Sequence, residues 1–260
     1  MIDLSFSMQD LEYFLLILVR VSCFVYIAPF YGMSNTPGRV KIGLAFFVSV
    51  LLYSVLTPAP ALEYNTVIGY ATIILKEAVT GLLLGFIVNI CNSIIQFAGS
   101  VIDMEVGLSM VTLMDPATKQ QSSVSGVLYQ YLVMLLLVVT GMYQYILKAF
   151  VEAYTLIPVN GAVLKTEAIL STMLRFMSDS ILIGFRICLP VFAVMLLLNA
   201  VLGILAKVSP QLNMFAVGLQ LKVLVGLAIM FFTISMLPGA ADFIFTEMKT
   251  MMVSVVEGMM

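Results

Sequence analysis

Polar and small side chains recur at helical spacing near the middle of a chain that is otherwise strongly apolar. Residues three or four apart lie on one face of a helix, so we expect these side chains to form one continuous face, here called the polar stripe. The stripe leads to Gly107, then to a methionine-rich stretch and the helix-stopping pair Asp115-Pro116. This order is what a guarded conduit would need, and core packing is the alternative. The polar stripe comprises Asn89, Ser93, Gln96, Ser100 and Asp103.

Enzyme chemistry has few candidate side chains in this sequence. Histidine is absent, which excludes Ser-His and Cys-His couples and histidine metal ligands. An intramembrane aspartyl protease would need two facing aspartates in helices. Asp103 and Asp115 are available, but Asp115 precedes a proline in a predicted turn. We therefore expect no catalytic residue, no metal and no cofactor. The cysteines are interpreted as core thiols, because their spacing fits neither a metal site nor a disulfide framework. They are Cys23, Cys91 and Cys188.

Charged side chains inside the predicted hydrophobic helices are further candidates. Each costs at least about 2.5–3.5 kcal/mol in hydrocarbon, so each should face protein, water or a lipid headgroup. A substrate path or proton relay is one interpretation. Snorkelling near a helix end, or a partnered structural ion, is the other, and it is favoured for Arg20, Lys76 and Arg186. Lys76 and Glu77 point in different directions on a helix and are not a pair by spacing. The charged residues are Arg20, Lys76, Glu77, Arg186 and Lys222.

Gly81 and Gly85 form a G-x-x-x-G motif next to the polar stripe. The motif permits the backbone of another helix to approach closely, and plain packing within the chain is the alternative to a functional role. Methionines 104, 110 and 114 surround the bend after Gly107. Because methionine is flexible and fills irregular space, they are either core filling or a deformable seal.

Composition indicates an all-α, polytopic membrane protein. The chain has 260 residues, of which 62% are hydrophobic and 10% charged, whereas soluble domains carry roughly 45–50% apolar and about 25% charged residues. Several uncharged runs approach or exceed the roughly 20 residues that cross hydrocarbon as a helix. The net charge of −2, with scattered lysine and arginine, offers no basic patch for nucleic acid.

The pattern predicts one domain, 1–260, with about six long hydrophobic helices. The N-terminus lacks the positively charged region of a cleavable signal peptide, so the first helix is expected to be retained. Glycine, proline and asparagine mark the loops between helices, and residues 148–180 fit a loop with an amphipathic helix. The loop residues singled out are Pro37, Arg39, Lys41, Pro210, Gln211 and Asn213. The expected helices are 11–31, 42–57, 67–106, 127–147, 181–207 and 213–237.

The positive charges give no orientation. If the helices cross a bilayer in sequence, four lysine or arginine residues fall on each side, so the positive-inside rule finds no bias. Either one span is re-entrant or interfacial, or the helices do not simply cross in order.

Several stretches together resemble the FliR family, a subunit of the bacterial flagellar export gate with relatives in type III secretion injectisomes. The most specific are Gly107-Leu-Ser-Met with Asp115-Pro116, and Pro210-Gln-Leu-Asn213. Length, order and spacing agree over nearly the whole chain. The chain has Leu219-Gln220 where the family often has Phe-Pro, and Tyr143 where it often has histidine. The other matching positions are 28–32, 37–41, Glu77, Gly81, Gly85, Phe86, Gly99, Asp103, Pro190, Asn199, Gly203, 214–215 and 218–222.

The resemblance implies a non-enzymatic subunit of a protein-export channel in the bacterial inner membrane, at the flagellar basal body. Members assemble with FliP and FliQ subunits into a helical, ring-like assembly, with FlhB and FlhA nearby, and unfolded flagellar subunits pass through its centre. The helices are expected to sit as hairpins largely within that assembly, partly raised out of the membrane lipid. The resemblance also implies a pore-plugging loop. Its residues are Gly107, Leu108, Ser109, Met110, Val111, Thr112, Leu113, Met114, Asp115 and Pro116.

A stand-alone small-solute transporter is the alternative. Inverted repeats between the two halves of the chain would favour it, but the polar stripe has no counterpart in the helices expected at 181–207 and 213–237. A plain membrane anchor would leave the polar stripe without a role.

Overall fold

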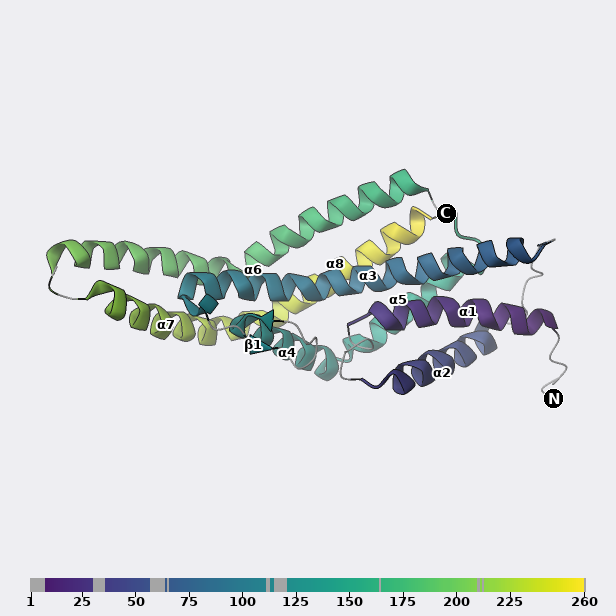
Figure 1. The fold of residues 1–260 in the computed structure, drawn as a ribbon, viewed down its shortest axis with the longest axis horizontal. Coiled ribbons are helices and arrows are strands. Elements are labelled where there is room, and N and C mark those ends of the chain that lie inside the picture. The colour runs from purple at the N-terminus through teal and green to yellow at the C-terminus, as the bar shows by residue number, and fades with distance from the viewer. Residues whose placement is uncertain are drawn as a thin grey trace. The chain divides into compact units, whose positions relative to one another are not determined.

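The computed structural model describes residues 8–29, 36–56, 64, 66–110, 113–114, 121–163, 165–209, 211 and 213–259. The regular secondary structure within these residues is helical, apart from one pair of two-residue strands (Figure 1). Four helical stretches are long and apolar enough to cross a membrane, 38–56, 67–106, 166–208 and 216–257. Helices α4 (Val124–Val139) and α5 (Met142–Leu156) together could add a fifth. The predicted class, an all-α polytopic membrane protein, is confirmed.

The internal contacts divide the chain into two compact units. The first unit comprises 1–90, 144–176 and 248–260, and the second comprises 91–143 and 177–247. Helices α3 (Val67–Val106), α6 (Thr166–Val208) and α8 (Leu237–Glu257) each continue from one unit into the other. The expectation of a single domain over 1–260 stays a prediction.

The first unit is built around α1 (Met8–Ile27). Helix α2 (Gly38–Leu56) lies beside it, with the Phe14 and Phe46 rings 5.8 Å apart in an edge-to-face contact (Figure 1). On another face of α1, Phe24 stacks on Phe150 of α5 (Met142–Leu156), with 4.2 Å between ring centroids. Offset and edge-to-face aromatic pairs add about 0.5–1.5 kcal/mol each beyond the burial of their area. The core of this unit therefore lies around α1, between α3 and α5.

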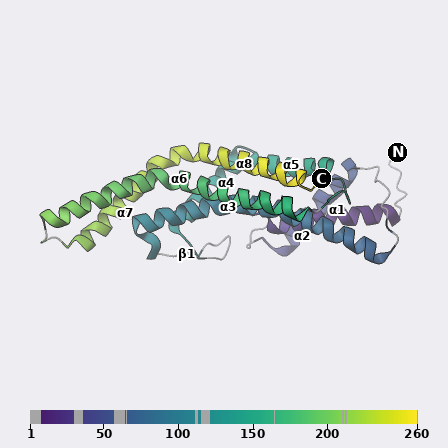
Figure 2. The same ribbon diagram turned by 90° about the horizontal axis from the view of Figure 1, so that it is seen from above.

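The second unit is built from two parts of the chain. The first part contains the end of α3, the 107–123 segment and α4 (Val124–Val139). The second part contains most of α6, α7 (Met214–Thr233), the 3-10 turn η2 (Ile234–Met236) and the start of α8. The C-terminal half of α6 and α7 run side by side, joined by a short connection, in both views (Figure 2). Phe97 of α3 meets Phe185 of α6 edge to face at 5.4 Å. Gly226 of α7 lies directly against Val106 of α3. At this end α3 therefore packs against both α6 and α7, while Met104 on its other face stays exposed.

Several helix bounds differ from those expected. The helix expected at 127–147 is two helices, α4 and α5. Helix α4 ends at Val139, with Thr140 as its C-cap, and Gly141 has φ +71°, a left-handed conformation that glycine adopts readily and that stops an α-helix. Helix α6 begins at Thr166 instead of 181, so the expected amphipathic helix and the following span are one continuous helix. The chain forms a further helix, α8, beyond the last of the expected helices, 213–237.

Candidate functional site

The C-terminal part of the polar stripe, from Gln96 to Asp103, faces α4. The side-chain amide of Gln96 donates a hydrogen bond of 2.8 Å to the Oε1 atom of Gln130. The hydroxyl of Ser100 donates to the backbone carbonyl of Gln96 at 2.9 Å and lies 3.4 Å from the hydroxyl of Ser123. Polar side chains of α3 therefore hold the start of α4.

Asp103 connects α3 directly to the first turn of α4. It is buried, with 1% of its surface exposed, and its carboxylate accepts hydrogen bonds from the backbone N–H and the hydroxyl of Ser125. The backbone bonds measure 3.2 and 3.3 Å. Ser125 lies in the first turn of α4, where N–H groups have no partner within the helix and the helix dipole favours an anion. The hydroxyl of Ser123 caps the same helix by accepting from the N–H of Gly126 at 3.1 Å.

Two glycines allow α3 and α4 to come this close. A Cβ added to Gly99 would collide with the backbone of Gly126 and lie 2.8 Å from the carbonyl carbon of Ser125. Both glycines are buried. The two helices therefore touch backbone to backbone beside the Asp103–Ser125 contact.

The segment between these helices begins at Gly107, whose φ of +89° ends α3. Its N–H still donates to the carbonyl of Asp103 at 3.0 Å. A 3-10 turn follows, η1 (Leu108–Met110), in which Leu108 is half-buried and Ser109 is exposed. Strand β1 (Leu113–Met114) then pairs antiparallel with β2 (Gln121–Ser122), with Leu113 opposite Ser122 and Met114 opposite Gln121. Of the predicted plug residues, Val111, Thr112, Asp115 and Pro116 lie outside the described residues.

The other predicted site residues are dispersed. Asn89 is half-buried in the first unit and Ser93 is exposed in the second, and both make polar contacts. Arg39 and Lys41 were expected in the loop before the second helix, but α2 begins at Gly38 and contains both. Pro37 precedes that helix, and its carbonyl accepts from the N–H of Val40 at 2.9 Å.

The loop before α7 is described in part. Asn213 caps α7 by accepting from the N–H of Ala216 at 3.4 Å, and Gln211 is exposed. Pro210 lies outside the described residues.

Gly81 and Gly85 lie against α1 in the first unit. A Cβ on Gly81 would collide with the backbone carbonyl of Arg20, and a Cβ on Gly85 would lie 3.0 Å from the carbonyl oxygen of Phe24. The absence of side chains at these two positions brings the α1 and α3 backbones together.

A buried ion pair accompanies this helix contact, and sequence spacing did not reveal it. Arg20 Nε donates to Glu77 Oε2 at 2.5 Å, and both side chains are fully buried. Arg20 Nη1 also donates to the carbonyl of Ile157 at 3.0 Å, and the N–H of Asn160 donates to Glu77 Oε1 at 2.9 Å. The Arg20 guanidinium lies 4.3 Å from the centre of the Tyr154 ring. The pair therefore ties α1, α3 and the turn after α5 together.

No group of three or more metal-binding side chains occurs in the part of the chain that the structure describes. All three cysteines are free thiols, of which Cys91 and Cys188 are buried.

Comparison with known proteins gives the family. The family described as Bacterial export proteins, family 1, matches residues 11–248. The chain is 33% identical to the flagellar biosynthetic protein FliR of Bacillus subtilis over 214 residues, which is 82% of each chain. The chain belongs to the FliR family of bacterial export proteins. It is also 26% identical to the FliR protein of Escherichia coli K12, over 92% of this chain and 90% of the relative. The match to the FliR protein of Aquifex aeolicus is 28%, over 84% and 83%.

Membership in the FliR family confirms the resemblance seen in the sequence. The family is one of export proteins rather than enzymes.

Proposed function

We propose that this chain is a subunit of the bacterial flagellar (type III) protein export gate. It forms part of the channel through which unfolded flagellar subunits are secreted, and it contributes a pore-plugging loop. The observation that carries the proposal is the family match, which runs from residue 11 to residue 248 and covers nearly all the helices.

The plug proposal is supported by the way that both ends of the 107–123 segment are held. At one end Gly107 turns the chain away from α3. At the other, Asp103 holds the N–H and the hydroxyl of Ser125, and Gly99 packs against Gly126. Both ends of the proposed plug are thus anchored on one closely packed helix pair, as a plug that opens and closes in place requires.

In the assembled gate, the polar stripe borders the path and supports the plug. Gln96, Ser100 and Asp103 support it directly, because their partners lie on α4 or just before it. Asn89 and Ser93 continue the same helix face and line the path.

We propose FliP and FliQ subunits as the direct partners, with FlhB and FlhA nearby, in the inner membrane at the flagellar basal body. Large apolar side chains along α2, including Phe46, Phe47 and Leu51, are more than half exposed in the single chain. Apolar surface of this extent calls for lipid or protein to cover it.

Deleting residues 110–114 tests the plug. The assembled gate should then leak small solutes in its resting state, which can be measured as dye or ion release from vesicles containing the purified complex. A deletion of equal length in the connection between α2 and α3, residues 58–62, is the matched control and should leave the resting gate closed. If the 110–114 deletion assembles normally and conducts no more than the parent, the plug assignment is wrong.

A further inference from the structure

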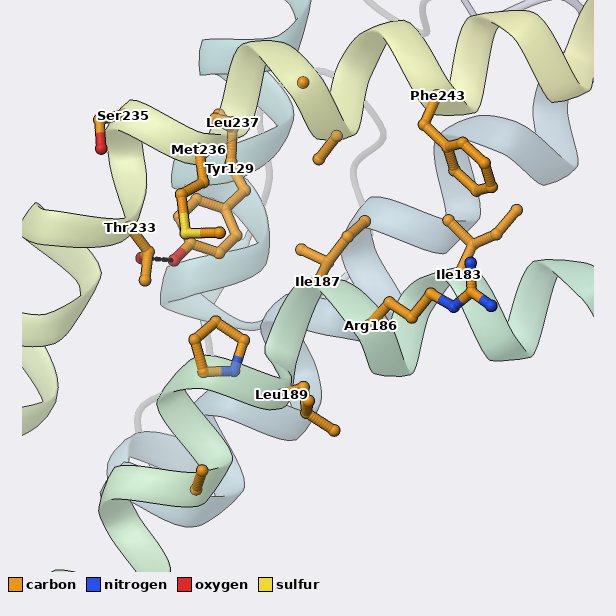
Figure 3. A pocket seen from close by; sticks show the side chains of 14 residues that line it. Tyr129, Ile183, Arg186, Ile187, Leu189, Thr233, Ser235, Met236, Leu237 and Phe243 are labelled. Atoms are coloured by element: carbon orange, nitrogen blue, oxygen red, sulfur yellow. Dashed lines mark hydrogen bonds between the residues drawn. The ribbon is translucent and has the colours of Figure 1, made fainter.

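The second unit contains a pocket of about 710 Å³ at a level where two helices are irregular. Pro190 lies inside α6 and lacks the N–H that would bond to the carbonyl oxygen of Arg186. On the facing side α7 ends at Thr233, and η2 separates it from α8. Figure 3 shows α6 changing direction beside Ile187 and Leu189, opposite η2 and α8. Helices that bend here do not pack along their full length, which leaves a pocket of the size that holds small ligands.

The walls of the pocket are almost entirely apolar. Side chains such as Ile183, Leu237 and Phe243 line it, with Ala193, Gly239 and Ala240 leaving space. Water is held in a cavity only where it finds two or more polar partners. This lining therefore favours a hydrocarbon chain over water.

The hydroxyl groups in the wall are already hydrogen-bonded within the protein. Tyr129 and Thr233 share a hydrogen bond of 3.2 Å, drawn dashed in Figure 3. Thr233 also donates to the carbonyl of Met230 at 3.0 Å, and Ser235 donates to the carbonyl of Phe232 at 2.9 Å. A ligand consequently meets one strongly polar group in the described lining, the guanidinium of Arg186.

Arg186 lines the pocket and is exposed. Its side chain extends from α6 toward the side where Phe243 lies (Figure 3). Among the residues that the structure describes, no carboxylate forms an ion pair with it. An exposed arginine on an apolar helix needs an anion or water, and its planar fork of donors suits a phosphate.

The position of Arg186 along α6 fits a lipid headgroup. The uncharged run 187–206 separates Arg186 from Lys207, and as a helix it is about 30 Å long, the thickness of the hydrocarbon layer. A membrane that covers this run therefore has phosphate groups near Arg186, with acyl chains beside Pro190 and Ala193.

We propose that this pocket binds one anionic phospholipid. One acyl chain fills the apolar space between α6 and α8, and the phosphate binds the guanidinium of Arg186. A zwitterionic lipid carries its own cation and competes poorly for a single arginine.

Two matched pairs of variants of the full-length protein test this. In nanodiscs of equal parts phosphatidylglycerol and phosphatidylcholine, native mass spectrometry should show retained phosphatidylglycerol. Arg186→Gln should lower its retention relative to phosphatidylcholine by about ten-fold, the value of one charge-assisted hydrogen bond. Lys207→Gln removes the same charge from the same helix outside the pocket and should leave the preference unchanged.

The second pair tests where the acyl chain lies. A Cβ at Gly239 meets nothing within 4 Å, so Gly239→Leu places a branched side chain in part of the pocket without a backbone clash. Gly203 is equally open but lies outside the pocket, so Gly203→Leu is its control. A phosphatidylglycerol with a diazirine near the end of one acyl chain should label peptides containing Ala193 or Gly239 in the parent and the control. It should not label them in Gly239→Leu.

Three results would overturn the proposal. The first is an equal loss of lipid preference in Arg186→Gln and Lys207→Gln. The second is photolabelling that is unchanged in Gly239→Leu, and the third is a protein helix that occupies this pocket in the assembled complex.

Discussion

Arg20 and Glu77 show how a membrane protein accommodates charge. A fully buried arginine is tolerable only because its neighbours replace water: a carboxylate, a backbone carbonyl and the face of an aromatic ring. The carboxylate of Glu77 in turn accepts a second hydrogen bond, from the backbone of Asn160. Removing one member leaves the other buried and unpaired, which is costly in a low-dielectric interior.

Glu77→Gln should therefore destabilise the first unit by about 3–5 kcal/mol, measured as a lower Tm of the purified protein in detergent. Lys148 and Glu152 of α5 form an exposed pair at 3.8 Å, and Glu152→Gln should change stability by less than about 0.5 kcal/mol. The double variant Arg20→Met, Glu77→Leu should recover part of the loss. Equal effects of Glu77→Gln and Glu152→Gln would show that the buried pair does not hold this unit together.

The partners in this network could not be predicted from spacing. Sequence alone marks Arg20 and Glu77 as charges in apolar helices and leaves snorkelling or a partnered structural ion open for Arg20. It does not join the two residues, because 57 positions separate them. The carbonyl of Ile157 belongs to a residue type that carries no signal for this role. Local patterns report which face a side chain occupies, whereas a long-range partner depends on how helices pack.

At the scale of elements, the contact between α3 and α4 fixes the two positions at which the 107–123 segment begins and ends. Its two helix backbones meet at Gly99 and Gly126, with Asp103 and Ser125 beside them. Such a contact tolerates no added methyl group, because the atoms in the way are backbone and cannot rotate aside.

Gly99→Ala should lower stability by about 1–3 kcal/mol, the usual cost of overpacking, and should speed proteolytic cleavage of the 107–123 segment. The control is Gly203→Ala on α6, where a new Cβ meets nothing within 4 Å. It should stabilise the protein by up to about 1 kcal/mol through better helix propensity. Comparable Tm values for the two variants would contradict a tight contact between α3 and α4.

Helix type followed from the sequence more readily than helix ends. The apolar runs and the polar stripe arise from local composition, so they could be predicted. The break at Gly141 could not, because a single glycine in an apolar run is compatible with a continuous helix. The continuity of α6 could not be predicted either, because the mixed residues 148–180 fit a loop with an amphipathic helix and the apolar run from 181 fits a separate span.

At the scale of the whole molecule, the proposed gate and a stand-alone transporter differ in mass. Gentle detergent extraction from the native membrane, followed by mass measurement, should give a large complex of several different proteins. The exposed apolar side chains of α2 would then be covered by neighbouring subunits or lipid. A monomer or homodimer that carries a bound solute would instead identify a transporter.

The Arg20–Glu77 network also bears on how the chain is made. Arg20 and Glu77 leave the ribosome early, but the backbone of Asn160, which completes the network, follows Glu77 by 83 residues. At about 5–20 residues per second, translation needs about 4–17 s to reach it. During that interval Arg20 and Glu77 can pair only with each other. Their hydrogen bonds to the backbone of Ile157 and Asn160 cannot yet form. The N-terminal helices of this unit thus mature only after the turn beyond α5 has been synthesised.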